Sequence, residues 1–433
     1  MTVPPGATGL AALIGPVAER FAAAGYRLYL VGGVVRDLAL AGDAPFDPGA
    51  NDIDLTTDAE PSAIKRLIAP MAEAVWSQGE RFGTIGAQVD GQAMEITTHR
   101  AEAYDEASRK PMVRFGTDLG EDLSRRDFTI NAVAVEVPGL VLHDPYDGLV
   151  DLVARRLRTP LSPEVSFTDD PLRMLRAARF LTRFDLTPDR ELVDAAVGLA
   201  DRLDIVSAER ITDELERLLA VADPGPGIRF LVDTSLLGRI LPAYRDDPAG
   251  IGLAAALAAV STARDEDRVL VRRAGLLWPI RQDAGDELRR LRHSRAAINS
   301  TVWLLDAAAD AVALGDRTGD EARSGVVRRI ADRIGTDRLD ALASLVWALA
   351  TEAPDVDAAA PAMLAATVDR LRSGEDLADL GAPLTGAEII AELGIEPGPE
   401  IGRLVRLLRD HRLDHGPIDR GEALRLLRSW RER

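Results

Sequence analysis

The spacing of hydrophobic and polar positions changes character after about residue 155. A short apolar run over 27–31 is followed by Gly32-Gly33 and then by a helical pattern over 34–40. This order predicts a strand, a tight turn and a helix. From about residue 160 onward, apolar positions recur at helical spacing, with many Ala, Leu and Arg residues and few β-branched runs.

Other short apolar runs in the N-terminal part alternate with polar positions as strands do. They cover 52–55, 83–89, 93–97, 133–137 and 140–143. Asp90-Gly91, between two of these runs, is a typical hairpin turn. The charged segment between His99 and Asp127 has little periodicity, and we expect part of it to be a mobile loop.

These patterns predict an α+β protein, in which a small mixed α/β head is followed by an elongated all-helical part. At 433 residues the chain is too long for one ordinary core, so two to four domains are expected. Breaks that contain proline and glycine separate the helical segments. We expect a head at 1–155, a helical neck at 156–225, a helical body at 226–375 and a helical tail at 376–433.

The composition is typical of a soluble globular protein, with 46% hydrophobic and 28% charged residues. No run of about 18 apolar residues suggests a membrane span, and Met1–Pro5 lacks the basic segment that begins a signal peptide. The chain contains no cysteine, which excludes disulfides, thiolate metal sites and cysteine nucleophiles. We expect a cytoplasmic protein, and the sequence indicates neither a membrane nor a protein partner.

The formal net charge of −18 bears on nucleic-acid binding. Proteins that bind RNA neutralise phosphates with Lys and Arg, so a basic surface is their usual mark, whereas an acidic total most often reflects solubility alone. RNA binding by this chain therefore requires arginines that gather locally. Arg403, Arg406 and Arg409 recur at three-residue steps and predict one basic stripe, although a solvated amphipathic helix would show the same spacing.

Carboxylates in the N-terminal part indicate metal chemistry. Asp52 and Asp54 are two positions apart on a predicted strand, so both side chains emerge on the same face. Carboxylates this close repel each other unless a cation lies between them, and an all-oxygen site suits Mg²⁺ with substrate phosphates as further ligands. Glu95, on a neighbouring predicted strand, is the candidate third carboxylate. Two Mg²⁺ ions bound here would activate a hydroxyl nucleophile and stabilise a leaving pyrophosphate.

An Asp-x-Asp pair alone is a weak signal, because a solvated strand end has the same pattern. Gly32 and Gly33 strengthen it, since glycines at a strand-to-helix turn let backbone N–H groups approach a phosphate at the positive end of the helix. Arg36, one turn further along, is expected to reach the same anion. Together, these features favour nucleotide transfer.

Five short motifs resemble those of a known enzyme family. Residues 30–37 (LVGGVVRD) with 52–55 (DIDL) resemble the first motif of class II tRNA nucleotidyltransferases, the CCA-adding enzymes and bacterial poly(A) polymerases of the polymerase β-like superfamily. Residues 125–132 (RRDFTINA) match the second motif almost letter for letter. Three further segments resemble the other motifs, in the same order: Asp144-Pro145 with Gly148, 169–173 (DDPLR), and Glu209-Arg210 with Glu214-Leu215. In the family, the motif that 169–173 resembles usually begins with Glu.

The resemblance implies a polymerase β-like head and template-independent addition of nucleotides to an RNA 3′ end. The implied substrates are CTP, ATP and the 3′ end of tRNA, where CCA is added or repaired with release of pyrophosphate. Segment 104–115 resembles the flexible loop of enzymes that complete a CCA end, which favours full CCA addition. The C-terminal segment resembles the tail that meets the tRNA elbow, so Arg403 and Arg406 become candidate RNA contacts.

The resemblance also implies a nucleotide pocket in which Asp170 and Arg173 read the incoming base. Four further residues would contact the nucleotide or brace this pair: Arg126, Asp127, Asn131 and Arg176. The spacing of Asp170 and Arg173 places both on one face of the helix expected to begin near Pro171. A carboxylate accepts from an exocyclic amino group, and a guanidinium donates to a ring nitrogen or carbonyl. Cytosine and adenine offer that combination, whereas uracil and guanine do not. A surface ion pair is the alternative explanation.

Two alternative functions stay open. The same chemistry would serve poly(A) addition or the addition of only part of CCA. A non-catalytic RNA-binding protein would lose its metal ligands first, so Asp52, Asp54 and Glu95 argue against it. Many bacterial relatives also carry a phosphohydrolase domain marked by a His-Asp pair and several further histidines; this chain has only five histidines, so we do not expect that activity. His411 and His415, four positions apart, are expected on a surface helix without a third metal ligand.

Overall fold

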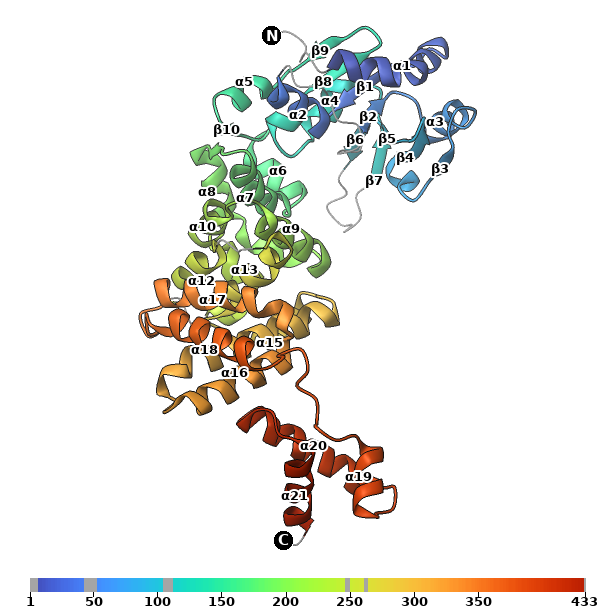
Figure 1. The fold of residues 1–433 in the computed structure, drawn as a ribbon. Coiled ribbons are helices and arrows are strands. Elements are labelled where there is room, and N and C mark those ends of the chain that lie inside the picture. The colour runs from blue at the N-terminus through green and yellow to red at the C-terminus, as the bar shows by residue number, and fades with distance from the viewer. Residues whose placement is uncertain (1–6, 43–52, 104–111, 246–249, 261–263, 432–433) are drawn as a thin grey trace. The chain divides into compact units, whose positions relative to one another are not determined.

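The computed structural model describes residues 7–42, 53–103, 112–245, 250–260 and 264–431. The chain divides into two compact units, Met1–Ile205 and Val206–Arg433. The described strands all lie in the first unit, and the second is built from helices (Figure 1). A mixed α/β head followed by a mostly helical region confirms the predicted fold class. The finer division into head, neck, body and tail stays a prediction.

A seven-stranded sheet with the order β3-β4-β5-β2-β1-β8-β9 forms the centre of the first unit. Only β2 and β5 pair in parallel; the other neighbours in this sheet are antiparallel. The strands are β1 (Leu28–Val31), β2 (Ile53–Thr57), β3 (Ala74–Trp76), β4 (Thr84–Val89), β5 (Gln92–Thr98), β8 (Ala134–Val137) and β9 (Val141–His143). All except β3 lie close to the bounds that the alternation predicts. Asp90 and Gly91 both have positive φ, as a two-residue hairpin turn requires.

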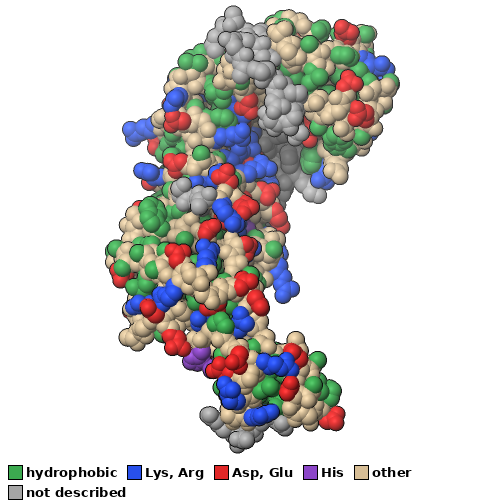
Figure 2. Space-filling view, in the orientation of Figure 1, with side chains coloured by type: hydrophobic (Ala, Val, Ile, Leu, Met, Phe, Trp, Pro, Cys, Tyr) green, Lys and Arg blue, Asp and Glu red, His purple; other side chains and the backbone are tan. Residues whose placement is uncertain are grey.

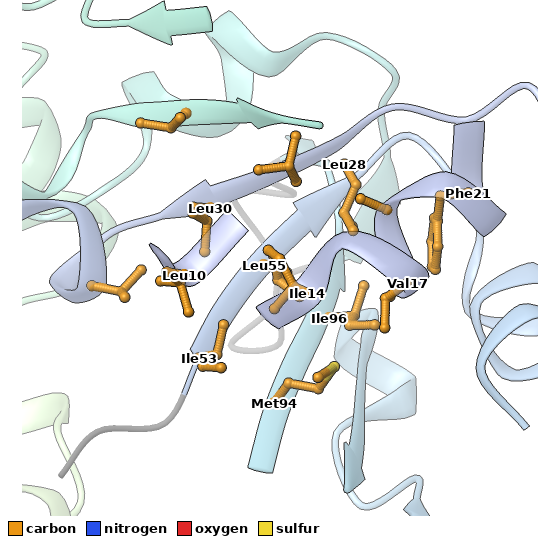
Figure 3. Close-up of a cluster of buried hydrophobic side chains, with 14 of the residues drawn as sticks. Leu10, Ile14, Val17, Phe21, Leu28, Leu30, Ile53, Leu55, Met94 and Ile96 are labelled. Carbon is orange, nitrogen blue, oxygen red and sulfur yellow. The ribbon is translucent and has the colours of Figure 1, made fainter. Parts of the chain in front are cut away.

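The first unit has its main core on one face of this sheet (Figure 3). Alternate strand residues such as Leu30, Leu55 and Ile96 point to this face, where α1 (Ala7–Ala23), α2 (Gly33–Ala41) and α3 (Pro61–Ile68) add apolar side chains. Burying one such side chain stabilises the fold by about 1.5–3 kcal/mol. Because side chains alternate along a strand, the same packing turns the intervening polar residues of β2 and β5 to the opposite face.

The segment between His99 and Asp127 contains more regular structure than its sequence predicts. β6 (Arg100–Ala103) and β7 (Met112–Phe115) form an antiparallel hairpin, and α4 (Leu119–Ser124) follows. Four-residue strands and a six-residue helix are too short to produce a clear period among so many charged positions. The predicted mobile loop falls mainly on 104–111, which lies outside the described residues.

Short helices complete the first unit: α5 (Gly148–Val153), α6 (Pro163–Asp169), α7 (Arg173–Arg183) and α8 (Arg190–Gly198). Between them, β10 (Arg156–Leu157) and β11 (Thr187–Pro188) pair in parallel. This pair interrupts a region that the sequence predicts to be wholly helical. Arg155 and Asp185 have positive φ, so each helix stops just before its strand, and Pro188 cannot continue a helical ladder.

The second unit contains thirteen described α-helices. They are α9 (Ala208–Ala220), α10 (Gly225–Asp233), α11 (Leu236–Ile240), α12 (Gly250–Ala258), α13 (Arg268–Leu277), α14 (Ala284–Arg290), α15 (Arg295–Val312), α16 (Asp320–Ile334), α17 (Leu339–Glu352), α18 (Ala360–Gly374), α19 (Gly386–Leu393), α20 (Pro399–His415) and α21 (Arg420–Arg431). The last three share a small core around Ile389, Leu404 and Leu427. α20 begins at Pro399 and continues to His415, where Gly416 with positive φ ends it.

One described segment, Arg295–Asp316, is long and apolar enough by length and composition to cross a membrane. It consists of α15 and the turn after it. The buried side of α15, including Leu304, Leu305 and Ala308, packs within the helical unit against α13, α16 and α17. The core position of this helix explains its apolar composition.

Close packing around Gly148 generates the first prediction. A Cβ atom at Gly148 would lie 2.0 Å from the backbone oxygen of Thr129, so Gly148→Ala must displace α5 and lower the free energy of unfolding by about 1–3 kcal/mol. Gly198→Ala in α8 is the control, because its Cβ would meet nothing within 4 Å. Urea denaturation of both variants measures the difference. Equal stability of Gly148→Ala and the unmodified chain would contradict the packing.

Candidate active site

Asp54 and Glu95 lie side by side on the polar face of the sheet. In the parallel pairing of β2 with β5, they are direct Cα partners, and neighbouring strands are about 4.8 Å apart. Their neighbours Ile53, Leu55 and Met94 enter the core, which fixes both carboxylates on the opposite face. Asp54 is half-buried and Glu95 is exposed. Asp52 lies outside the described residues.

The glycine turn predicted between β1 and α2 is present. Gly32 has a positive φ of 71° and precedes the first residue of α2, Gly33. A Cβ atom at Gly32 would lie 2.9 Å from Nη1 of Arg126, so the absence of a side chain lets this guanidinium approach the turn. Nη2 of Arg126 lies 3.1 Å from Asp122, four residues earlier. The structure thus places Arg126 of the second motif directly at the helix N-terminus of the first.

Arg36 is buried within the protein at the start of α2. Its guanidinium donates to Asp37 at 2.9 Å and to the side-chain oxygen of Asn131, and it lies 4.2 Å from the ring centre of Phe184. Burial lowers the pKa of Arg36. These contacts orient Arg36 towards the second motif and α7, which differs from the simple expectation of a side chain extended towards an anion.

Asp127 is the centre of the network that joins these elements. One carboxylate oxygen accepts hydrogen bonds from the Phe128 backbone at 2.9 Å and from Asn131 at 2.8 Å; the other accepts from Arg176 Nε at 2.9 Å. Burial alone would raise the pKa of Asp127. The charge of Arg176, the hydrogen bonds from Asn131 and Arg176, and the charge of Arg173 outweigh burial and lower the pKa from 3.8 to about 2.

The arginines and phenylalanines of α7 form the other side of the network. Phe180 has guanidinium groups over its ring from Arg36 and Arg176, each 5.4 Å from its centre, and Arg179 at 4.7 Å. Such cation–π contacts stabilise by about 0.5–2 kcal/mol each, depending on desolvation. Lys and Arg side chains gather around α6 and α7 on the visible face (Figure 2). This part of the first unit is therefore locally basic in an acidic chain.

Asp170 and Arg173 lie at the junction of α6 and α7, rather than on one helix as predicted. α6 ends at Asp169, and α7 begins at Arg173. Asp170 has an extended backbone (φ −139°, ψ 98°), because a residue that precedes proline avoids helical angles, and its carboxylate accepts from the Leu172 backbone at 3.2 Å. Arg173 donates to Ser166 Oγ at 2.8 Å and to the backbone oxygen of Arg125, so its guanidinium is held next to the second motif.

The residues that fit a divalent cation are Asp54 and Glu95, whose carboxylate oxygens are the ligands that Mg²⁺ prefers. Among the described residues, no cluster of three His, Asp or Glu side chains has the geometry of a metal site. Asp52, the expected third member, is not one of those residues.

Several residues of the site were not predicted from the sequence. Phe180 and Phe184 alternate with arginines at helical spacing in 176–184 (RAARFLTRF), and this pattern could have revealed the stacked face of α7. Asp122 lies four positions before Arg126, and this spacing is common for ion pairs on helices. No pattern in the sequence pointed to His99. This histidine is buried, its Nδ1 lies 2.9 Å from Thr56 Oγ1, and burial lowers its pKa.

The candidate RNA contacts lie in the second unit, on α20. Arg403 and Arg406 are exposed, whereas Arg409 forms an ion pair with Asp332. Acidic side chains are interspersed with the basic ones over the C-terminal helices (Figure 2). On the same helix, the rings of His411 and His415 are 4.5 Å apart, and Nδ1 of His415 lies 3.2 Å from Glu321.

Comparison with known families gives two matches along the chain. Residues 28–158 match the poly A polymerase head domain, and residues 185–247 match a domain described as a probable RNA and SrmB-binding site of polymerase A. The CCA-adding enzyme of Lactobacillus johnsonii is 35% identical over 239 residues, which are 55% of this chain and 57% of that protein. That of Lactobacillus gasseri is 37% identical over 222 residues, 51% and 53% respectively. The chain spans about half the length of the curated relatives it matches.

Solved structures resemble the chain over nearly its full length. The Bacillus stearothermophilus CCA-adding enzyme in complex with CTP superposes with a TM-score of 0.73 and 25% identity, covering 100% of this chain and 98% of that one. The Thermotoga maritima CCA-adding enzyme complexed with tRNA has a TM-score of 0.64 and 20% identity, covering 97% and 95%. At 20% identity, the match to the Thermotoga maritima structure shows a likeness of fold alone.

The lowered pKa of Asp127 generates the second prediction. Since its folded pKa is below the unfolded value, the stabilisation is present above about pH 4 and is lost as pH falls through 2; a shift from 3.8 to about 2 corresponds to about 2 kcal/mol. The difference in unfolding free energy between the unmodified chain and Asp127→Asn should therefore shrink by about that amount between pH 4 and 2. Asp194→Asn, at an exposed ion pair, is the control. A difference independent of pH would rule out this role of Asp127.

Proposed function

The chain belongs to the class II nucleotidyltransferases, the family of CCA-adding enzymes and poly(A) polymerases, and we propose that it adds nucleotides to the 3′ end of tRNA. The proposed reaction joins CTP and ATP to complete or repair the CCA end, with release of pyrophosphate. One observation carries the proposal: Asp54 and Glu95 are register partners on the polar face of the sheet. A nucleotide-dependent reaction on tRNA also agrees with a cytoplasmic protein.

We propose that Asp52, Asp54 and Glu95 hold two Mg²⁺ ions. When bound, these ions would activate the 3′-hydroxyl of the RNA and neutralise charge on the triphosphate. The protein's own contribution is rigidity: Asp54 and Glu95 are fixed between core residues on adjacent strands, so the carboxylates are in place before a substrate arrives.

The glycine turn is proposed to receive the triphosphate. Gly32 and Gly33 present the N-terminus of α2, and Arg126 lies against Gly32 with part of its side chain exposed. Arg36, Asp127, Asn131 and Arg176 are largely occupied with one another. We therefore assign these four chiefly to bracing the nucleotide pocket, with Arg176, at 30% side-chain exposure, the best placed of them to touch the nucleotide as well.

Asp170 and Arg173 are proposed to select the base. Ser166 and the Arg125 backbone orient Arg173, and the backbone of Leu172 orients Asp170. A carboxylate beside a guanidinium complements the amino group and adjacent acceptor that cytosine and adenine share. In the second unit, the exposed Arg403 and Arg406 are proposed to contact RNA phosphates.

Poly(A) addition and partial CCA addition use the same residues, and they are distinguished by product rather than by site. The names of the relatives favour CCA addition, since both Lactobacillus proteins are CCA-adding enzymes. A non-catalytic RNA-binding protein is disfavoured, because two carboxylates directly opposite on adjacent strands destabilise a sheet unless they serve a ligand.

The chemistry is tested with Asp54→Asn. This change keeps the shape of the side chain but removes a metal-binding charge, so it should abolish incorporation of CTP and ATP into tRNA in Mg²⁺ while leaving the unfolding transition intact. Asp58→Asn, near the other end of β2, where Asp58 bonds Arg27, is the matched control and should retain transfer. Incorporation by Asp54→Asn at the rate of the control would refute the proposed metal site.

Base selection is tested with Asp170→Ala and all four nucleoside triphosphates on tRNA that ends at the discriminator base. UTP places a carbonyl where cytosine has its amino group, and the resulting mismatch with a carboxylate costs about 1–3 kcal/mol, or roughly ten- to a hundred-fold in discrimination. Asp170→Ala should therefore raise the use of UTP relative to CTP and lower the overall rate. Asp169→Ala, one position earlier, is the control. An unchanged C-to-U ratio in Asp170→Ala would show that the base is read elsewhere.

A further inference from the structure

The row of residues that contains the two carboxylates extends across the sheet to its edge. Asp54 pairs with Glu95, Glu95 pairs with Gly86 on β4, and Gly86 pairs with Trp76 on β3. Direct partners on neighbouring strands point to the same face. Trp76 therefore lies on the catalytic face, two strands from Glu95, and only a glycine separates them.

Trp76 is not directed into solvent but lies over Gly86. A Cβ atom at Gly86 would be 1.8 Å from Nε1, 2.2 Å from Cε2 and 2.5 Å from Cδ1 of the indole. Similar distances to three consecutive ring atoms mean that this point lies beneath the ring face rather than beyond its edge. The indole is thus laid flat across the sheet towards Glu95, and it occupies the place of a side chain at position 86.

The opposite face of the indole is available to a ligand. Trp76 is 37% exposed, although one ring face covers Gly86. All three residues of β3 are exposed, and β3 is the edge strand of the sheet. An aromatic ring that lies flat beside the two carboxylates, with part of its surface exposed, is suited to stack against a nucleic-acid base.

We propose that Trp76 is a stacking platform for the 3′-terminal base of the acceptor RNA. This proposal rests on the proposed nucleotidyltransferase function, which requires the terminal 3′-hydroxyl beside Asp54 and Glu95. The base of that same nucleotide must then lie one or two strand spacings away, about 5–10 Å, which is where the indole lies. Stacking suits this position because every base has a flat face, whereas hydrogen-bond recognition would accept only one base.

An enzyme that builds CCA must accept more than one terminal base on its acceptor RNA. The acceptor ends first at the discriminator base, then at C and then at CC. A platform that ignores base identity can hold all three, while selection stays with the pocket for the incoming nucleotide. Trp76 would thus hold the acceptor RNA whatever its terminal base, and the Asp170–Arg173 pair would select the incoming nucleotide.

The test compares Trp76→Ala, Trp76→Leu and Trp76→Phe in the full chain, with Trp347→Ala as the control at another exposed tryptophan. Trp76→Leu keeps an apolar cover over Gly86 without an aromatic face, so it separates stacking from folding. The probe is an acceptor-stem minihelix, ending either in a normal nucleotide or in an abasic one, titrated without nucleoside triphosphate. Loss of the terminal base should weaken binding about ten-fold in the unmodified chain and Trp76→Phe, a size expected for aromatic stacking.

In Trp76→Ala and Trp76→Leu the normal and abasic RNAs should bind equally, and the KM for RNA should rise about ten-fold while that for CTP stays unchanged. An abasic penalty that persists in both variants would overturn the proposal, because the base would then be held elsewhere. A raised KM for CTP alone would also overturn it and place the incoming base on Trp76. If the unmodified chain bound the normal RNA more tightly than the abasic one but transferred no nucleotide, stacking on Trp76 would be supported and the nucleotidyltransferase function refuted. The two proposals can therefore fail separately.

Discussion

A buried carboxylate that must stay charged constrains most of the candidate active site. Asp127 is buried, and it stays ionised because Arg176 and Asn131 bond to it directly. Asn131 in turn accepts a hydrogen bond from Arg36, which stacks on Phe184, the residue directly after α7. Leaving a buried charge unpaired is far more costly than an ordinary lost hydrogen bond. The glycine turn, the second motif and α7 are therefore held in fixed positions relative to one another.

The parts of the first unit that could be predicted are those in which one local signal is strong. Six strands were predictable because each is a short apolar or alternating run that packs against a core, and the two-residue turn at Asp90 and Gly91 fixes the pairing of two of them. β3 was not predicted, because all three of its residues are exposed and buried and exposed positions do not alternate along it. The three-residue spacing of Asp170 and Arg173 predicts that both lie on one helix, but Pro171 keeps Asp170 extended, so the prediction is wrong at this junction. Stacking of Arg36 on α7 depends on contacts distant in sequence, which no local pattern contains.

The acidic total charge is easier to reconcile with RNA once the arginines are located. Several serve the interior: Arg272 donates to backbone oxygens of Leu219, Val221, Ala222 and Val260, and Arg328 pairs with the buried Glu375. Such arginines cannot neutralise phosphates. The surface that remains repels RNA at long range, apart from local basic regions such as that of α7. Short-range contacts that do not depend on charge, such as the proposed stacking on Trp76, would then contribute more to RNA binding.

The register between β2 and β5 also limits how this sequence can vary in length. Asp54 and Glu95 lie on the polar face of the sheet only because Ile53, Leu55, Met94 and Ile96 face the core. A single-residue insertion or deletion within either strand would exchange the two faces, sending a carboxylate inward and a leucine or isoleucine outward. Such a change disrupts the carboxylate pair and the core packing together. Length changes should consequently be confined to the turns between these strands, and a shift of two residues would be less harmful than a shift of one.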